Sequence, residues 1–406
     1  MPAPRLSTRA QGMPASPIRR LAPHAVAARA AGKTVYSLNI GQPDLPTPRE
    51  VLDRMRTYPG ANVPYGPSQG LPEFLEALRT YYGRLGLRLG LEELFVTTGG
   101  SEAILFVLAA LCDPGDEVLV FEPFYTNYAG FSSLVGVVPV GVTTRAEDGY
   151  HLPSRAAIEE KVGPRTRALL VCSPNNPTGT VYTDEEMELL ADVCRKHDLW
   201  LVSDEAYREF AYDGLVHHSA LMLSGLEDRV VVVDSLSKRA SLCGARIGNV
   251  VCRNPELMAA ILKMGQARLC PPTLGQWAAS AYVDVPPSYM EGVIASYTRR
   301  RDVVWHALQE TPGVTVHRPE GAFYVCARLP VDDAERFAVW LLQDFDLDGE
   351  TVIFSPAEGF YVTPGLGRDE ARIAYVLESA KMARCMEIVT SALRVYPGRT
   401  ALVEGA

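Results

Sequence analysis

Residues 230–238 read Val-Val-Val-Val-Asp-Ser-Leu-Ser-Lys, and Arg246 follows eight residues after Lys238. Four consecutive valines predict a strand that is buried on both faces, as is typical of a parallel sheet covered by helices. In open α/β sheets, ligands bind beyond the carboxyl ends of the strands. The serines and Lys238 at the end of this strand are therefore candidates for a binding site, although a solvated basic turn is the commoner fate of such residues.

Helix and strand signals alternate along the middle of the chain. Residues 72–85 carry apolar side chains at helical spacing, and residues 101–112 are apolar nearly all round, as in a buried helix. Thr183 and Glu186 form a capping box that predicts a helix ending near His197. Buried strands are predicted at 94–97, 118–121, 168–172, 200–202 and 230–233. This alternation predicts an α/β fold in which helices cover both faces of a mostly parallel sheet.

The pattern changes after residue 286 and predicts a smaller α+β domain. Helices are expected at 288–309, 332–345 and 379–394, and short strands at 314–316, at 322–328 and from Arg372. We therefore divide the chain into an N-terminal arm (1–44), a large domain (45–286) and a small C-terminal domain (287–406). The arm has basic residues but no acidic one before Asp44, a bias that transit peptides share. An arm packed on the protein or its partner is preferred, because no hydrophobic signal core is present.

Composition argues against several classes of partner. The 406 residues carry a formal net charge of −9, which disfavours nucleic acid because a phosphate backbone attracts basic surfaces. No apolar run reaches the ~18 residues that a membrane helix needs. The eight cysteines include no C-x-x-C pair, so reduced buried thiols in the cytoplasm are expected rather than a metal site or a disulfide framework.

Three further motifs lie upstream of Lys238. Residues 99–103 read Gly-Gly-Ser-Glu-Ala between a predicted strand and a helix, where glycines permit close approach of a ligand and the helix N-terminus attracts phosphate. Residues 173–179 read Ser-Pro-Asn-Asn-Pro-Thr-Gly and residues 203–207 read Ser-Asp-Glu-Ala-Tyr, each following a buried strand. Taken singly, these motifs have ordinary explanations: a helix start, a tight turn and an N-cap aspartate.

Together with Lys238, the motifs supply what a phosphorylated aldehyde cofactor such as pyridoxal 5′-phosphate (PLP) needs. Its phosphate needs N–H donors and a cation, its ring nitrogen a carboxylate, its phenolic oxygen hydrogen-bond donors, and its aldehyde a lysine. Asp204 follows a strand directly and is placed to provide the carboxylate, and the planar guanidinium of Arg246 suits the phosphate. The sequence contains no H-E-x-x-H motif for a rival metal mechanism.

The order and spacing of these motifs resemble the class I aminotransferases of PLP fold type I, the aspartate aminotransferase superfamily. The resemblance covers roughly residues 36–375 and rests on Asn-Asn-Pro-Thr-Gly, Asp-x-x-Tyr, and Ser-x-Ser-Lys followed by arginine. It implies a seven-stranded, mostly parallel sheet in the large domain and a homodimer. It also implies PLP as the cofactor, with an amino acid and a 2-oxo acid as substrates.

The resemblance implies a role for each motif residue. Lys238 resembles the Schiff-base lysine, Asp204 the partner of the pyridine nitrogen, and Asn176 and Tyr207 the donors to the phenolic oxygen. Tyr125 matches the aromatic residue that stacks on the cofactor, where many members have tryptophan. The expected phosphate site consists of Gly100, Ser101, the Glu102 backbone N–H, Ser235, Ser237, Arg246 and, across a subunit boundary, Tyr65.

Substrate contacts are implied in the same way. Arg372, within Glu-Ala-Arg-Ile-Ala, matches the arginine that clamps the substrate α-carboxylate, a task suited to a bidentate guanidinium. Gly41 resembles part of a loop that closes over the substrate, Asn176 lies beside it, and Phe323 resembles an aromatic at the pocket mouth. The candidate cations for the substrate side chain are Arg239, Arg268 and Arg368, and no motif selects among them.

The implied reaction is a ping-pong transamination in which Lys238 moves a proton between substrate and cofactor. By family analogy alone, glutamate and 2-oxoglutarate are expected as one exchange pair, with aspartate or a related amino acid as the donor to 2-oxoglutarate. A PLP-dependent lyase that eliminates a β-substituent is the rival enzyme, since it would share Lys238, Asp204 and Arg246. The non-enzyme alternative is the PLP-binding effector domain of a transcription regulator. It is disfavoured because the roughly 35 residues before Tyr36 are too few for a DNA-binding module.

Overall fold

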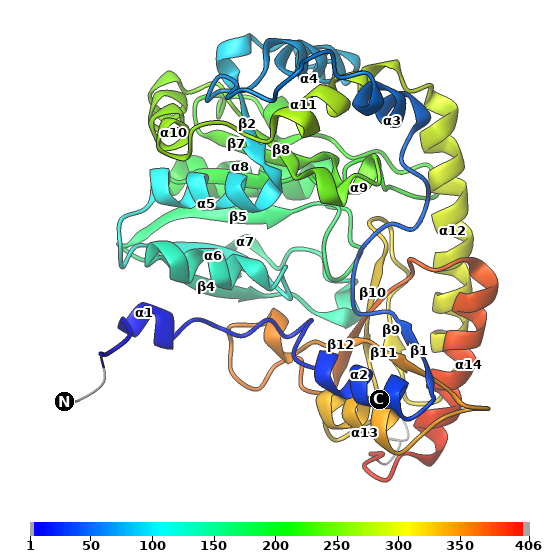
Figure 1. Cartoon of the computed structure of the whole chain (residues 1–406). Helices are drawn as coiled ribbons and strands as arrows, with labels where there is room; N and C mark the ends of the chain where they lie inside the picture. The colour runs from blue at the N-terminus through cyan, green and yellow to red at the C-terminus, as the bar shows by residue number, and fades with distance from the viewer. Residues whose placement is uncertain (1–3, 401–406) are drawn as a thin grey trace.

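The computed structural model describes residues 4–400 and contains, within them, a seven-stranded sheet in the order β2-β8-β7-β6-β5-β3-β4 (Figure 1). Its strands are β2 (Leu94–Thr98), β3 (Glu117–Glu122), β4 (Val138–Thr143), β5 (Thr166–Cys172), β6 (Trp200–Asp204), β7 (Val230–Ser235) and β8 (Ile247–Cys252). Strands β4, β3, β5, β6 and β7 run parallel to one another, and β8 runs antiparallel to both β7 and β2. The prediction of a mostly parallel seven-stranded sheet is confirmed.

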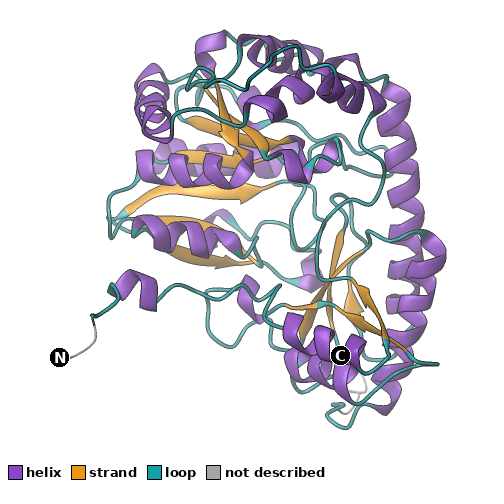
Figure 2. Ribbon diagram, in the orientation of Figure 1, coloured by secondary structure: helices purple, strands orange, loops and turns teal. Residues whose placement is uncertain are grey.

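Helices cover both faces of this sheet (Figure 2). Because successive side chains of a strand point to opposite faces, Val118 and Val120 pack in one core with α5 (Gly99–Leu111), α6 (Asn127–Val135) and α10 (Pro255–Arg268). Leu119 and Phe121 pack in a second core with α4 (Pro72–Arg84) and α8 (Asp184–His197). The capping box of Thr183 and Glu186 starts α8 as predicted. The shorter helices of this part are α3 (Arg49–Arg56), α7 (Arg155–Glu159), α9 (Leu236–Arg239) and α11 (Thr273–Ala279).

The C-terminal part is built on smaller sheets. An antiparallel sheet has the order β12-β13-β10-β9, with β9 (Thr315–Val316), β10 (Tyr324–Arg328), β12 (Ser355–Pro356) and β13 (Glu370–Ala374). The helices are α12 (Pro287–Gln309), α13 (Ala334–Gln343) and α14 (Ser379–Val395), and Figure 1 shows α12 extending along both parts of the molecule. Strand β10 starts later than predicted because Ala322 has a left-handed φ of 53°. The domain limits at residues 44 and 286 stay a prediction.

The N-terminal arm packs on the rest of the chain. It contains α1 (Thr8–Gln11), α2 (Ala22–Ala30) and β1 (Thr34–Ser37), and β1 pairs in parallel with β11 (Glu350–Ile353). Leu21, Ala25 and Ala28 are buried, and Arg20 forms an ion pair with Glu335 of α13. Figure 1 shows the arm in dark blue, passing from α1 to α2 beside the small sheets. Among the described residues, no helix is long and apolar enough to cross a membrane.

A buried ion pair fixes the turn that follows β7. Nη1 of Arg239 donates to both carboxylate oxygens of Asp234, at 2.7 and 2.9 Å, and both side chains are almost fully buried. Asp234 also accepts hydrogen bonds from the Ser235 backbone N–H at 2.6 Å and from the Tyr82 hydroxyl at 3.2 Å. Asp234 precedes the short helix α9 and Arg239 ends it, so this pair holds both ends of the segment that carries Lys238.

Arg239→Met should lower the free energy of unfolding by about 3–5 kcal/mol, because it leaves the Asp234 carboxylate buried without its ion-pair partner. Urea denaturation of the purified variants measures this loss. Arg167→Met is the matched control, since Arg167 pairs with Asp116 while remaining 49% exposed, and its loss should be much smaller. Equal shifts in the two variants would contradict the role given to the buried pair.

Candidate active site

A cavity of about 510 Å³ lies where polar residues follow the carboxyl ends of several strands of the large sheet. Apart from the three candidate cations for the substrate side chain, it brings together all but three of the site residues predicted from the sequence. Those that line it are Gly41, Gly100, Ser101, Tyr125, Asn176, Asp204, Tyr207, Ser235, Ser237, Lys238, Arg246 and Arg372. These residues come from segments that are far apart in the chain, so the fold and no single motif assembles the site.

Lys238 presents its amine to this cavity from α9. Its Nζ donates a hydrogen bond to the backbone oxygen of Gly41 at 2.7 Å and lies 5.8 Å from the ring centre of Tyr207. Burial lowers the pKa of Lys238, and the positive charges of Arg372 and Arg246 lower it further. A lysine with a lowered pKa is more often neutral, which is the form that acts as a nucleophile or base.

Asp204 ends β6 and forms no ion pair among residues 4–400. Oδ2 accepts a hydrogen bond from the Tyr128 hydroxyl at 2.6 Å, and Oδ1 accepts one from the Ala206 backbone N–H at 3.1 Å. Burial raises the pKa of Asp204 to about 6, while those two hydrogen bonds oppose the rise. A carboxylate in this situation gains stability from a cationic ligand, and the protonated ring nitrogen of PLP is such a group.

The opposite side of the cavity is a cradle suited to phosphate. The N-terminus of α5 opens onto it through Gly100 and Ser101, beside the hydroxyls of Ser235 and Ser237 and the guanidinium of Arg246. Gly99, the first residue of α5, has a φ of 72°, and a Cβ there would collide with that guanidinium. Helix N-terminal amides, hydroxyls and a guanidinium are the donors that bind phosphate in proteins. The residues present therefore fit the phosphate of PLP as well as its ring.

Arg372 is a buried guanidinium that has no carboxylate partner among the described residues. Nη1 donates to Oδ1 of Asn176 at 3.1 Å, and Nη2 donates to Oγ of Ser355 at 3.3 Å and to the backbone oxygen of Asn39. Its Nε has no hydrogen-bond partner, and burial lowers the pKa of Arg372. Burying a cation without an anion is unfavourable, so this side chain is poised for an anionic ligand that accepts from the guanidinium.

Three predicted residues do not line the cavity. The expectation for Phe323 is wrong: its side chain is fully buried and stacks on Tyr297 with ring centres 5.2 Å apart. Tyr324 faces the cavity instead, and its hydroxyl is 2.8 Å from that of Tyr207. The Glu102 side chain turns back to accept from the Thr98 backbone N–H at 2.8 Å. Tyr65 is 79% exposed, so a role in a neighbouring subunit stays a prediction.

None of the cations proposed for the substrate side chain reaches the cavity. Arg239 is paired with Asp234, Arg268 lies 3.3 Å from Glu102, and Arg368 lies 3.3 Å from Asp333. Sequence reasoning also missed several residues that do line it. The missed residues are Ser16, Ile18, Arg19, Ile40, Gln42, Ile104, Asn127, Phe131, Cys172, Ala206, Cys243 and Tyr324.

Residues 33–389 match the family model described as aminotransferase class I and II. The chain belongs to this family. Aspartate/prephenate aminotransferase of Thermus thermophilus is 35% identical over 326 residues, covering 79% of this chain and 83% of that protein. Arginine–pyruvate transaminase of Pseudomonas aeruginosa is 32% identical, covering 82% of this chain and 86% of that protein. The solved structure of Thermus thermophilus aspartate aminotransferase with maleate superposes with a TM-score of 0.87 at 31% identity, over 96% of this chain and 100% of that one.

The family membership and the fold together identify the protein as an enzyme, a PLP-dependent aminotransferase of PLP fold type I. Its relatives differ in the substrates that their names print, from aspartate and prephenate to arginine and pyruvate. Family membership therefore establishes the type of reaction and leaves the choice of amino acid to the residues around the cavity.

Asp204→Asn should stabilise the cofactor-free protein at neutral and alkaline pH. The pKa of Asp204 rises from 3.8 to about 6 on folding, so the folded protein binds this proton more tightly than the unfolded chain does. The stability that the protonated carboxyl provides is fully present below pH ~3.8 and is lost as the pH rises through ~6. The neutral variant should therefore be more stable above pH ~6, by on the order of 1–2 kcal/mol once water in the cavity is allowed for, and equal near pH ~4.

Urea denaturation of the two proteins with cofactor removed, at intervals from pH ~4 to ~8, measures that difference. Asp228→Asn serves as the control, because the Asp228 side chain is 73% exposed and should show no such trend. A wild-type protein that is as stable as Asp204→Asn at pH ~8 would contradict the burial argument.

Proposed function

We propose that this chain transfers the amino group of an L-amino acid to a 2-oxo acid such as 2-oxoglutarate, using PLP bound in the cavity. The observation that carries the proposal is the combination of a lysine of lowered pKa with two unpaired charges, the Asp204 carboxylate and the Arg372 guanidinium. Each of the three meets a different need of an amino acid reacting on PLP. Aspartate or a related amino acid is the proposed donor.

The residues that would hold PLP divide by the part of the cofactor they meet. Ser101, Ser235, Ser237, Arg246 and the first amides of α5 would bind the phosphate. Asp204 would face the ring nitrogen, with Tyr128 keeping the carboxylate in place. When bound, PLP supplies an electron sink that stabilises negative charge at the substrate Cα. Lys238 would hold its aldehyde, and Tyr125, Asn176 and Tyr207 would contact the ring and its phenolic oxygen.

Lys238 is proposed to move the proton. The lowered pKa of Lys238 would leave part of its amine unprotonated and able to take up a proton. A base with a pKa near the working pH is the effective one for proton transfer. The Gly41 backbone oxygen, 2.7 Å from Nζ, orients the amine between transfers.

Arg372 and Asn176 are proposed to orient the substrate. The Arg372 guanidinium would bind the α-carboxylate, which supplies the anion that this buried cation lacks. Asn176 accepts from Arg372 at 3.1 Å and so couples the carboxylate site to the cofactor site. Fixing the α-carboxylate would restrict how the substrate lies relative to Lys238, and such positioning lowers the entropic part of the barrier.

Lys238→Ala should lower the rate of amino transfer by at least about 10²- to 10⁴-fold, the usual contribution of a positioned acid–base group. Conversion of the bound cofactor from its aldehyde to its amine form, followed by absorbance in a single turnover, measures the rate. Lys263→Ala is the control, because Lys263 is exposed on α10, and it should react as the wild type does. A Lys238→Ala enzyme with a near-normal rate would overturn the assignment.

The same assay separates amino transfer from the rival lyase reaction. After an amino acid has converted the cofactor to its amine form, a transaminase regains the aldehyde form when 2-oxoglutarate is added. A β-eliminating lyase needs no acceptor and releases pyruvate and ammonia from a suitable substrate. Pyruvate and ammonia in the absence of any 2-oxo acid would therefore favour the lyase.

We also propose that the enzyme works as a homodimer in the cytoplasm. Tyr65 is 79% exposed and lies in a segment with exposed Val63, as expected if it reaches a neighbouring subunit's phosphate site. The cytoplasmic location is supported by eight free cysteines, six of them buried, since disulfides are rare in that compartment.

Light scattering coupled to size-exclusion chromatography should give about twice the 44.3 kDa mass of the chain. Tyr65→Phe should keep that mass and lose PLP more readily on dialysis, because one hydrogen bond to the phosphate is removed. A fully active monomer would contradict the dimer, and unchanged PLP retention in Tyr65→Phe would contradict the role of Tyr65.

A further inference from the structure

We propose that Arg19 of the N-terminal arm binds a carboxylate at the far end of the substrate side chain, so that the enzyme prefers dicarboxylic substrates. The inference rests on the transamination proposed above and adds the residue that binds the substrate side chain. The cations lining the cavity are Lys238, Arg246, Arg372 and Arg19, and its acidic residue is Asp204. The first three have tasks in holding PLP and the α-carboxylate, which leaves Arg19 for the rest of the substrate.

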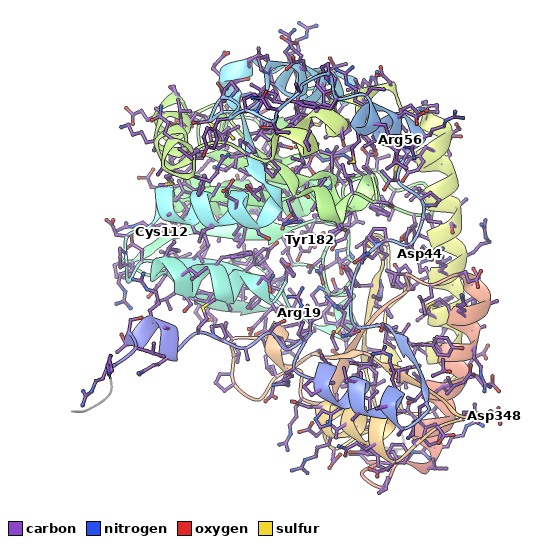
Figure 3. All side chains as sticks on the ribbon, viewed as in Figure 1. Arg19, Asp44, Arg56, Cys112, Tyr182 and Asp348 are labelled. Atoms are coloured by element: carbon purple, nitrogen blue, oxygen red, sulfur yellow. The ribbon has the colours of Figure 1, made fainter. Side chains whose placement is uncertain are left out.

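The Arg19 guanidinium is available for a ligand. Within residues 4–400 it makes no hydrogen bond or ion pair, and the residue is exposed. The next residue, Arg20, instead pairs with Glu335 of α13 and anchors the arm there. Figure 3 shows Arg19 where the arm passes between the large-domain sheet and the small sheets. Two adjacent arginines thus differ in role: one fastens the arm, and the other lines the cavity.

The turn that carries Arg19 is held by Asn39, which also supports Arg372. The backbone N–H groups of Arg19 and Arg20 each donate to the Ser16 oxygen at 3.1 Å, which closes the turn. Nδ2 of Asn39 donates to the Ile18 oxygen at 2.9 Å, while the Asn39 backbone oxygen accepts from Arg372. Asn39 therefore ties the turn at residues 16–20 to the proposed α-carboxylate site.

A second contact holds the same turn, at residues 16–20, against the small domain. Pro17 is buried against Gly359, and a Cβ at Gly359 would collide with the proline ring. Glycine at this position allows the arm to approach closely enough for its next residues to line the cavity. Contacts of Pro17 and Asn39 hold the chain before Arg19, and the Arg20–Glu335 ion pair holds it directly after Arg19. The backbone position of Arg19 is therefore fixed from both directions along the chain.

The surroundings of Arg19 suit a short aliphatic chain that ends in a charge. Ile18, Ile40 and Phe131 line the same cavity as Arg19 and offer apolar contacts to methylene groups. Burial raises the pKa of the Tyr125 hydroxyl, and the charges of Arg372, Arg19 and Arg246 oppose that rise, which places Arg19 within electrostatic reach of the ring that would stack on PLP. An anion near Tyr125 would therefore lie in the field of Arg372, Arg19 and Arg246.

The test compares two ligands of equal length that differ by one carboxylate. Isothermal calorimetry measures binding of succinate and of butyrate to the PLP-loaded enzyme at pH ~8, where both are fully ionised. The wild type should bind succinate about 10- to 100-fold more tightly, as expected for a hydrogen-bonded ion pair. Arg19→Gln should reduce the ratio to within about threefold, and Arg19→Lys should keep part of it. A wild type without preference, or an Arg19→Gln enzyme that keeps it, would overturn the proposal.

Two variants separate the side chain from the arm. Arg9→Gln removes the same charge from an exposed position on α1 and should leave the succinate preference intact. Arg20→Gln loosens the anchor to Glu335 and reports on docking of the arm. If Arg20→Gln abolished the preference while Arg19→Gln kept it, arm docking and not the Arg19 guanidinium would select the ligand, and the proposal would be wrong.

Turnover provides an independent measure. For Arg19→Gln, kcat/KM with aspartate should fall about 10- to 100-fold, while kcat/KM with alanine should change less than about threefold. Equal losses with both amino acids would contradict a side-chain role. Because succinate and butyrate carry no amino group, the binding result tests Arg19 even if no amino acid reacts. A wild-type enzyme that converts no amino acid would refute the proposed function and leave the binding result standing.

Discussion

The arrangement around the cavity depends on two charges that are held without counter-ions, the Asp204 carboxylate and the Arg372 guanidinium. Their partners are neutral groups: the Tyr128 hydroxyl for Asp204, and Asn176 with Ser355 for Arg372. Neutral partners fix the position of a charge without cancelling it. The charge then remains available to a ligand, and its burial cost is offset only when that ligand binds.

Other buried carboxylates at the strand ends have ion-pair partners. Asp234 has Arg239 at 2.7 Å, and Glu205 has Arg208 at 2.5 Å with the His217 ring at 3.3 Å. Both carboxylates are paired within the chain, Asp234 in the segment that carries Lys238 and Glu205 directly after Asp204. The contrast between paired and unpaired charges therefore separates the structural from the functional ionisable residues more sharply than burial alone, since Arg372 is as fully buried as Asp234 and Glu205.

The sequence predicts those features that depend on local pattern. Strands buried on both faces appear as runs such as the four valines of β7, and the residues directly after them reach the cavity because parallel strands end at one edge. Phe323 was misplaced because Ala322 has a left-handed backbone, which breaks the alternation that would have located its neighbours. Tyr128 and Arg19 carry no local signal, since only the packing of α6 and the arm on distant segments brings them to the site.

Chemistry and selectivity come from parts of the molecule with different constraints. Asp204 ends β6, Lys238 lies just after β7, and Arg246 lies just before β8. The register of these strands fixes the relative positions of the three residues; for example, it pairs Asp204 with Cys172 of β5. Arg19 stands on an exposed turn, where its charge keeps much of its hydration until a ligand arrives. A further cation buried among the strand ends would be repelled by Arg372 and Arg246 and would have to lose that water in every state. A charge on the arm therefore lowers stability less than the same charge among the strand ends would. The sequence of the arm can also differ between proteins without disturbing the residues that would hold the cofactor.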